Sequence, residues 1–348
     1  MEGREPPPRQ SGIRAFMAAA PKAELHVHLE GCLYPELIHR LSIRNEVHVD
    51  LDNGETSAGH DKALEMFFDR YFKGMQVLIT EHDFYEVVRD YVDKVAEQNV
   101  MHVEMFFDPQ AHLERGIEFK TIIAGVQRAA SYARTAHDMS FSLIMCFLRE
   151  KSVESAMRVL QDAAPFRNII TGVGLDGDPT QSLPRQFKDV FQKAREMGFN
   201  TTAHCDIMPS DGIEQIRQSV EDLKVDRLDH ASCIFDDESL TVLVRDKELG
   251  ITCCPRTNVL LHQDTGAGTI RLMLAKGLKC SVHSDDPGHF EAYINDNLQA
   301  LSDEGLELED MDRLVRNSIE SSWASSERKR AMLHALDSCK LQDVVRRS

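Results

Sequence analysis

Two histidines separated by one residue are the first feature of this sequence that could do chemistry. His26 and His28 alternate with Leu25, Val27 and Leu29 in a stretch that has the pattern of a β-strand. Successive side chains in a strand point to opposite faces, so both imidazoles project from one face and the apolar side chains from the other. Two imidazoles on one face can hold a divalent ion. An isolated pair is more often structural, so the interpretation depends on further residues.

Further candidate ligands follow other predicted strands. His204 and His230 end the fifth and sixth strands, and Asp285 and Asp286 follow the eighth. Enzymes built as parallel barrels collect their active-site residues at such carboxyl ends. Three imidazoles and one carboxylate suit zinc, whereas Mg²⁺ and Ca²⁺ prefer oxygen ligands. We therefore predict one zinc ion per chain, with a position open for a water of lowered pKa and with four protein ligands: His26, His28, His204 and Asp285.

Other metal and catalytic motifs are incomplete. A bridged two-metal site would need a lysine after the fourth strand, and residues 172–178 contain none, so we expect a single metal. His102 and Glu104 match half of the cytidine-type deaminase motif, but the paired PCxxC is missing. We expect these two residues to be structural polar groups of the barrel wall or interior. The sequence also lacks GxSxG, HExxH and GxGxxG motifs.

Eight short β-like stretches must position these residues. Helix-like segments alternate with them, which is typical of a closed (β/α)8 TIM barrel. An open doubly wound sheet would need a Gly-rich phosphate loop after an early strand. The predicted strands are 23–29, 100–107, 141–148, 169–175, 200–204, 226–230, 250–254 and 279–284.

A long segment, residues 31–98, separates the first two predicted strands. It is rich in helix formers and aromatic side chains, which predicts a helical insertion. These helices could form a lid over the barrel mouth or pack on the outside of the barrel. From Pro287 onward the pattern is helical to the end.

The composition indicates a globular protein with a substantial core. The chain has 348 residues, 42% of them hydrophobic, and its net charge of −17 argues against nucleic acid or an anionic membrane as a partner. Eight cysteines without a CxxC pair indicate free thiols in a reducing compartment, and no apolar run could span a membrane. We therefore predict a cytoplasmic or nuclear protein. We also predict a disordered leader over 1–20 and a single domain over 21–348.

The order of the motifs resembles that of the adenosine/adenine deaminase family from residue 20 onward. The matching segments are AELHVHLEG (23–31), GLDGD (174–178), AH (203–204), LDH (228–230), CPRTN (254–258) and SDDP (284–287). Two further segments, VEMFFDPQ (103–110) and YINDN (293–297), resemble the adenine deaminase branch more than the nucleoside-using enzymes. The resemblance implies a zinc-dependent hydrolase of purine metabolism.

The resemblance also implies roles for individual residues. It gives the same four zinc ligands, among them Asp285, and makes His230 the catalytic residue that orients the attacking hydroxide. It implies that Asp286 bonds the imidazole side of a purine and that the backbone N–H of Gly177 bonds its pyrimidine side. Glu30 falls where the family contacts the sugar side of its substrate or closes that space.

One position departs from the family pattern. Residues 204–207 are His-Cys-Asp-Ile, where the family usually has His-Ala-Gly-Glu. That glutamate protonates the ring nitrogen beside the attacked carbon, and losing a positioned general acid costs about 10²- to 10⁴-fold in rate. Ile207 cannot donate a proton. Asp206 and His283 are candidate replacements, although His283 and Arg256 could equally be residues of the rim.

Two hypotheses for the function follow. In the first, a zinc-activated water attacks a C–N centre of a small purine-like heterocycle; Ile207 leaves open a changed substrate or a hydrolysis that needs no ring protonation. In the second, the protein is an inactive relative that binds zinc and a small ligand. Release of ammonia from adenine distinguishes the two. The sequence predicts no particular oligomeric state.

Overall fold

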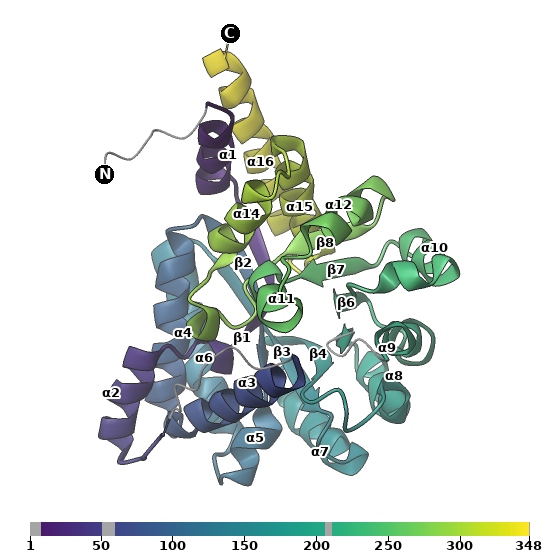
Figure 1. Cartoon of the computed structure of the whole chain (residues 1–348). Helices are drawn as coiled ribbons and strands as arrows, with labels where there is room; N and C mark the ends of the chain where they lie inside the picture. Colours follow the sequence, from purple (N-terminus) through teal and green to yellow (C-terminus); the bar gives the residue numbers. More distant parts are fainter. Residues whose placement is uncertain (1–7, 51–59, 206–210, 348) are drawn as a thin grey trace.

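Eight parallel strands form the centre of the molecule and helices surround them (Figure 1). The computed structural model describes residues 8–50, 60–205 and 211–347. The strands are β1 (Lys22–His28), β2 (Val100–Phe107), β3 (Ser140–Leu148), β4 (Ile170–Asp176), β5 (Asn200–Cys205), β6 (Arg227–His230), β7 (Gly250–Cys253) and β8 (Lys279–Val282). Each pairs with the next along the chain. All eight predicted strands are confirmed to within two residues at each end.

The barrel closes where β8 leads back to β1. Val27 forms a bridge with Asp285. The N–H of His28 donates to the carbonyl of Asp285, and the N–H of Asp285 donates to the carbonyl of His26, each over 2.9 Å. The predicted (β/α)8 TIM barrel is confirmed, and the closing bridge itself brings predicted metal ligands together.

Helices follow the strands and cover the outside of the barrel. They are α1 (Pro8–Ala19), α2 (Pro35–Asn45), α3 (His60–Gly74), α4 (Glu81–Ala96), α5 (Pro109–Glu114), α6 (Phe119–His137), α7 (Val153–Ala163), α8 (Lys188–Glu196), α9 (Gly212–Gln218), α10 (Glu238–Asp246), α11 (Pro255–His262), α12 (Ala267–Ala275), α13 (Pro287–Phe290), α14 (Ile294–Asp303), α15 (Leu308–Ser321) and α16 (Ser326–Arg347). Local sequence sets several starts: Thr80 caps α4 in a capping box with Asp83, and Ser152 and Asp237 cap α7 and α10.

The insertion between β1 and β2 is helical, as predicted, and its helices divide between the two expected positions. The aromatic side chains of α3, Phe67 and Tyr71 among them, line the pocket at the carboxyl ends of the strands. Helix α4 instead packs beside α6 on the outside of the barrel, with Phe84 fully buried. Helix α3 therefore covers the barrel mouth, and α4 belongs to the outer helical layer.

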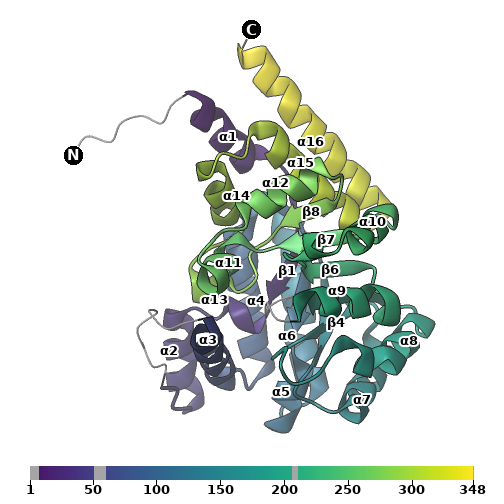
Figure 2. The same cartoon turned by 45° about the vertical axis from the view of Figure 1, so that its right-hand side comes forward.

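The predicted disordered leader is wrong over residues 8–19. This segment forms α1, whose apolar side chains at i, i+3 and i+4 (Ile13, Phe16 and Met17) are buried in the main core. Helices α1 and α16 lie together at the end of the molecule that carries both termini, opposite α2 and α3 (Figures 1 and 2). The structured unit thus begins before residue 21, and residues 1–7 lie outside the described part of the chain. None of the described helices has the length and hydropathy needed to cross a membrane.

Polar side chains inside the barrel form a buried network that is separate from the predicted metal ligands. Glu104 accepts hydrogen bonds from Arg227 over 2.7 Å and from His102 over 3.0 Å. The guanidinium of Arg227 lies 4.1 Å from the ring centroid of Trp323. The prediction that His102 and Glu104 are structural polar groups is confirmed by these contacts.

The burial of Lys22 at the start of β1 can be tested through the pH dependence of the protein's stability. It is fully buried, and its amine donates to the carbonyls of Ala20 and Gln98 over 2.8 and 2.7 Å. Burial lowers the pKa of Lys22 to about 7, where an exposed lysine has 10.5. A neutral amine still satisfies both carbonyls.

Between pH 7 and 10.5 the unfolded chain therefore binds a proton at Lys22 that the folded chain has released, so this residue makes stability rise with pH. We expect the free energy of unfolding to rise by roughly 3 kcal/mol more in the wild type than in Lys22→Met between pH 7 and 9.5. Urea unfolding at both pH values measures this. Parallel pH profiles for the two proteins would contradict the assignment.

Candidate metal centre

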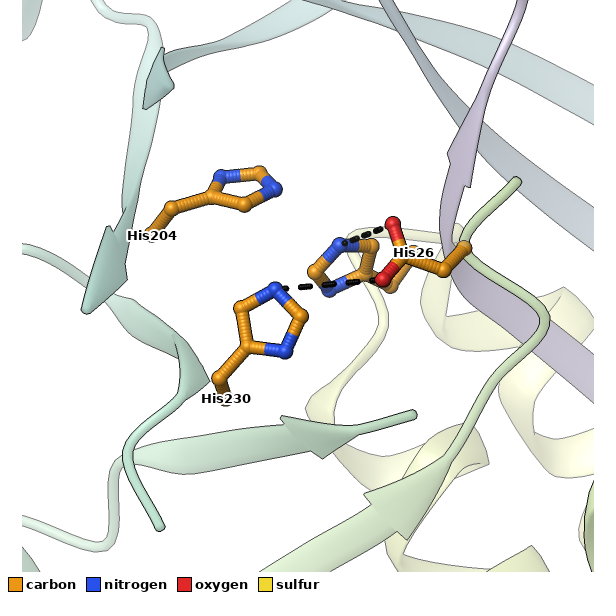
Figure 3. A group of neighbouring side chains, drawn as sticks. His26, His204 and His230 are labelled. Atoms are coloured by element: carbon orange, nitrogen blue, oxygen red, sulfur yellow. Dashed lines mark ion pairs between the residues drawn. The ribbon is translucent and has the colours of Figure 1, made fainter. Parts of the chain in front are cut away.

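Four buried residues from four different parts of the barrel converge at its carboxyl end. His26, His204, His230 and Asp285 each place a potential ligand atom within 4.8 Å of the others. Figure 3 shows the three imidazoles pointing toward one another from β1, β5 and β6. Carboxylate oxygens of Asp285 lie 3.3 Å from His26 and 3.9 Å from His230. The fold therefore places these side chains at the carboxyl ends of the strands, as predicted.

His28 belongs to the same cluster. Its Nε2 lies 3.2 Å from Nε2 of His204 and 3.4 Å from Oδ1 of Asp285. Nε2 of His26 lies 3.3 Å from the same carboxylate oxygen. All four predicted ligands thus direct one donor atom each into a common space.

These spacings fit one metal ion. Two ligand atoms at about 2.1 Å from a tetrahedral zinc ion are separated by ~3.4 Å. The three separations of 3.2 to 3.4 Å match that value. Nε2 of His26 has no hydrogen-bond partner although it is buried, which is costly unless the atom binds something. The donor set and its geometry therefore fit a zinc ion.

The protonation of His28, His204 and Asp285 also suits metal binding. At His26, burial disfavours the charged form, but the charge of Asp285 outweighs burial and raises the pKa of this imidazole. Burial lowers the pKa of His28 to about 3 and that of His204 well below its usual value, so both imidazoles are neutral near pH 7. Burial also disfavours a charge on Asp285, but the surrounding imidazoles outweigh it and hold the pKa of this carboxyl well below normal. Neutral imidazoles and an ionised carboxylate are the forms that bind metal.

His230 is placed differently from the other histidines. Its Nε2 lies 3.9 Å from Oδ2 of Asp285, the oxygen that also accepts a hydrogen bond from Thr257 over 2.8 Å. His230 and Asp285 both have left-handed backbone conformations, with φ of 67° and 62°. Such conformations are rare and costly outside glycine and tend to occur at functional sites.

Phe106 on β2 forms the floor of this cluster. Its ring stacks on His28 with centroids 4.9 Å apart, and the edges of His26 and His204 approach it at 5.0 and 5.2 Å. This fully buried side chain restricts the orientation of three imidazoles. Phe106 could not be selected from its sequence context, since an apolar strand residue is usually only part of the core.

A pocket opens from the cluster toward α3. Apolar and aromatic side chains supply most of its wall, and carboxyl groups and the histidines supply its polar part. The residues that line it are His28, Leu64, Phe67, Phe68, Tyr71, Phe72, Asp108, Leu148, Asp176, Gly177, His204, His230, Thr257, Asp285, Asp286 and Phe290. The pocket therefore combines an apolar, largely aromatic surface with the histidines and carboxyl groups of the cluster.

Of the three predicted substrate-binding residues, Asp286 and Gly177 line this pocket and Glu30 does not. Glu30 is fully buried and accepts hydrogen bonds from His112 over 2.7 Å and from the backbone N–H of Asp108 over 3.2 Å. The hydroxyl of Tyr71, which does line the pocket, lies 3.4 Å from Glu30. Glu30 is therefore held behind the pocket wall.

Several carboxyl groups of this region keep a proton near neutral pH. Burial and the neighbouring Glu30 raise the pKa of Asp108 to about 7. Burial and Asp285 raise the pKa of Asp286 well above normal, and burial with Asp108 does the same to Asp176. One oxygen, Oδ1, of each of these three aspartates is buried without a hydrogen-bond partner. The pocket thus offers carboxyl groups that can donate as well as accept.

Asp108 and Asp176 are functional candidates that the sequence interpretation missed. Asp108 directly follows β2 and Asp176 ends β4, the same strand-end position that identified His204. Asp176 Oδ2 lies 3.8 Å from Nδ1 of His28. Both acids lie in segments that carry the family resemblance, VEMFFDPQ (103–110) and GLDGD (174–178), but a single acid at a strand end has no spacing pattern that indicates its role.

Of the two candidate replacement acids, His283 lies within the described residues and Asp206 does not. The prediction that His283 could supply a proton to substrate, or lie at the rim, is wrong. This side chain is fully buried, with Nε2 2.8 Å from Ser281 Oγ and Nδ1 3.0 Å from Glu24 Oε1, in a layer below the ligands. Asp206 and Ile207 lie outside the described residues. Arg256 is exposed, as expected for a residue of the rim.

Comparison with known proteins places this geometry in a family. The family model described as adenosine deaminase matches residues 21–339. An uncharacterized deaminase of Schizosaccharomyces pombe is 39% identical over 94% of this chain and 97% of its own length. An adenine deaminase of Psychrobacter cryohalolentis is 38% identical over 91% of this chain and 96% of its own. The crystal structure of an adenine deaminase from Arthrobacter aurescens superimposes with a TM-score of 0.85 at 33% identity, covering 92% of this chain and 99% of that one.

Proposed function

Because this chain belongs to the adenosine deaminase family, and so is a metal-dependent hydrolase of the deaminase type that acts on C–N bonds, we propose that it uses zinc to remove the exocyclic amine of adenine or a close analogue. The observation that carries the proposal is the convergence of three imidazoles and one carboxylate beside an apolar pocket, with three ligand-atom separations of 3.2 to 3.4 Å. The proposed zinc ligands are His26, His28, His204 and Asp285.

The metal is proposed to be zinc because three imidazoles and one carboxylate match its ligand preference. When bound, zinc lowers the pKa of a coordinated water and so supplies a nucleophile at neutral pH. His230 lies at the pocket, 3.9 Å from Oδ2 of Asp285, and is not needed as a ligand. We assign to His230 and Asp285 the orientation of the attacking water and the acceptance of its proton.

Substrate recognition is assigned to the pocket wall. Asp286 and the backbone N–H of Gly177 offer hydrogen bonds to the ring nitrogens of a purine, and Phe67, Tyr71 and Phe290 offer apolar surface to its faces. Asp286 is suited to a ring nitrogen because burial raises the pKa of its carboxyl group, which favours the protonated form that can donate a hydrogen bond. The adenine deaminase relatives support this substrate class.

The buried Glu30 favours a free base over a nucleoside. Its bonds to His112 and to the N–H of Asp108 hold it in the wall, where it cannot turn to bind a ribose hydroxyl without leaving polar groups unpaired. We therefore expect zinc-loaded protein to release ammonia from adenine at least about 100-fold faster, in kcat/KM, than from adenosine, a discrimination of the size that unpaired buried groups give. Chelator-treated protein is the control. Equal turnover of the two compounds would contradict the role given to Glu30.

Gly31 provides a direct test of the role of Asp286. A Cβ at residue 31 would lie 1.9 Å from Oδ1 of Asp286 and 2.9 Å from its Cα, so Gly31→Ala must displace this aspartate. We expect the KM for adenine to rise about tenfold, the loss of one hydrogen bond in a buried site. Gly268→Ala in α12 is the matched control, because a Cβ there meets nothing within 4 Å. A folded Gly31→Ala protein with an unchanged KM would remove Asp286 from substrate binding.

We propose the cytoplasm as the site of this reaction. No disulfide joins any of the eight cysteines, all of which lie in the described part of the chain, and six of them are buried, as expected in a reducing compartment. The partner implied by the pocket is a small molecule rather than nucleic acid, in line with the net charge of −17.

A further inference from the structure

A buried carboxylate lies directly behind the proposed zinc ligands. Asp229 on β6 is fully buried, and the strand register places it between His204 on β5 and Thr252 on β7. Thr202 donates to its Oδ2 over 2.7 Å, and Thr252 donates to its Oδ1 over 2.8 Å. Nε of Arg227 lies 4.0 Å from Oδ1.

The hydrogen bonds of Asp229 fix the position of a proton on His26. A carboxylate accepts hydrogen bonds and donates none, so the single hydroxyl proton of Thr252 must point to Asp229. The oxygen of Thr252 is then an acceptor for Nδ1 of His26, 2.8 Å away. Nδ1 of His26 must therefore carry a proton, so Nε2 is the ring nitrogen that can offer a lone pair to a cation. That Nε2 faces Asp285 and has no hydrogen-bond partner.

The same carboxylate acts on His204 through its charge. Nδ1 of His204 lies 3.7 Å from Oδ2 of Asp229 and has no hydrogen-bond partner among the described residues. The nearby negative charge favours a proton on this nitrogen. Nε2 of His204 is then free to bind, and it is the atom that lies 3.2 Å from Nε2 of His28. Asp229 thus favours the same tautomer, with the proton on Nδ1, in both His26 and His204.

We propose that Asp229 is a positioning residue, which acts through Thr252 on His26 and directly on His204, so that both imidazoles present Nε2 to a divalent cation. This inference rests on the proposed zinc site and deepens it. Outer carboxylates that orient histidine ligands typically contribute 10- to 100-fold to metal affinity. Here the effect passes through a threonine hydroxyl rather than a direct bond, which makes the hydroxyl itself testable.

Zinc affinity, measured by competition with a chromophoric chelator, tests the proposal. We expect Thr252→Val and Asp229→Asn each to weaken zinc binding about 10- to 100-fold. Thr252→Ser, which keeps the hydroxyl, should restore affinity to within about threefold of the wild type. The double variant should bind zinc no more weakly than the weaker single variant, because both changes break one chain of contacts.

A matched control separates this role from general packing. Thr201 is also a buried threonine of β5 whose hydroxyl donates to a carboxylate, Asp226 Oδ2, over 3.0 Å. Thr201→Val should lower stability and leave zinc affinity unchanged. Equal losses of zinc affinity in Thr201→Val and Thr252→Val would overturn the proposal, as would wild-type affinity in folded Thr252→Val.

An NMR measurement on metal-free protein keeps this test independent of the proposed function. The Nδ1 proton of His26 should be protected from solvent exchange in the wild type and in Thr252→Ser, and lose protection in Thr252→Val. A wild type that binds no zinc would contradict the proposed function, while the protected proton would still support the positioning role. Absence of that proton in the wild type would overturn it.

Discussion

Ile207→Glu is expected to raise the rate of zinc-dependent adenine deamination by about 10²- to 10⁴-fold. Removal of an aromatic amine requires a proton on the ring nitrogen beside the attacked carbon, and the family's glutamate supplies it from this position. The isoleucine at 207 cannot. The remainder of the site, including the four ligand atoms and the pocket carboxyls, is in place. The measurement is kcat for ammonia release from adenine at saturating zinc.

Ile207→Gln is the matched control for this gain. Glutamine has the shape of glutamate and no transferable carboxyl proton, so its rate should remain at the wild-type level. A folded, zinc-loaded Ile207→Glu protein that is no faster than the wild type would show that the pocket itself has diverged from adenine. That result would favour the hypothesis of a changed substrate or that of an inactive relative.

Asp285→Ala is expected to abolish zinc binding and to lower turnover by about 10⁴-fold or more. The carboxylate lies 3.3 and 3.4 Å from two imidazole nitrogens, and its other oxygen faces His230. Its loss removes a charged ligand together with the activated water, which is worth several kcal/mol in the transition state, and each 1.36 kcal/mol is tenfold in rate. Zinc content by atomic absorption and ammonia release measure the two effects.

Asp286→Ala distinguishes a ligand from its neighbour in this experiment. It removes an adjacent buried carboxyl that lines the pocket, so we expect zinc content to be unchanged and the KM for adenine to rise. If Asp285→Ala retained full zinc content, the ligand assignment would be wrong. If Asp286→Ala lost zinc as well, the two carboxylates would share the ligand role.

The sequence was sufficient for the barrel because strand signals in parallel sheets are strong. Runs such as 141–148 are apolar on both faces, as parallel strands must be when helices cover the sheet. Each strand also ends close to a polar residue that turns the chain. The start of the fold was harder to predict: only three apolar side chains hold α1 to the core, within a polar, proline-rich context.

The metal cluster was predictable and the rest of the pocket was only partly so. The spacing of His26 and His28 is a local pattern, and the strand-end rule added His204 and Asp285. The depth of His283 was not predictable, because its burial depends on Glu24 across the closed barrel, 3.0 Å away. The proton-bearing state of Asp108 likewise arises from Glu30, a residue distant in sequence.

The most direct test of the central claim is the release of ammonia from adenine by the wild-type protein, before and after removal of zinc. The site geometry predicts measurable turnover that a chelator abolishes and that added zinc restores. Turnover that persists without metal would contradict the role of the histidine–aspartate cluster. No ammonia from a folded protein with one zinc bound per chain would contradict adenine as its substrate.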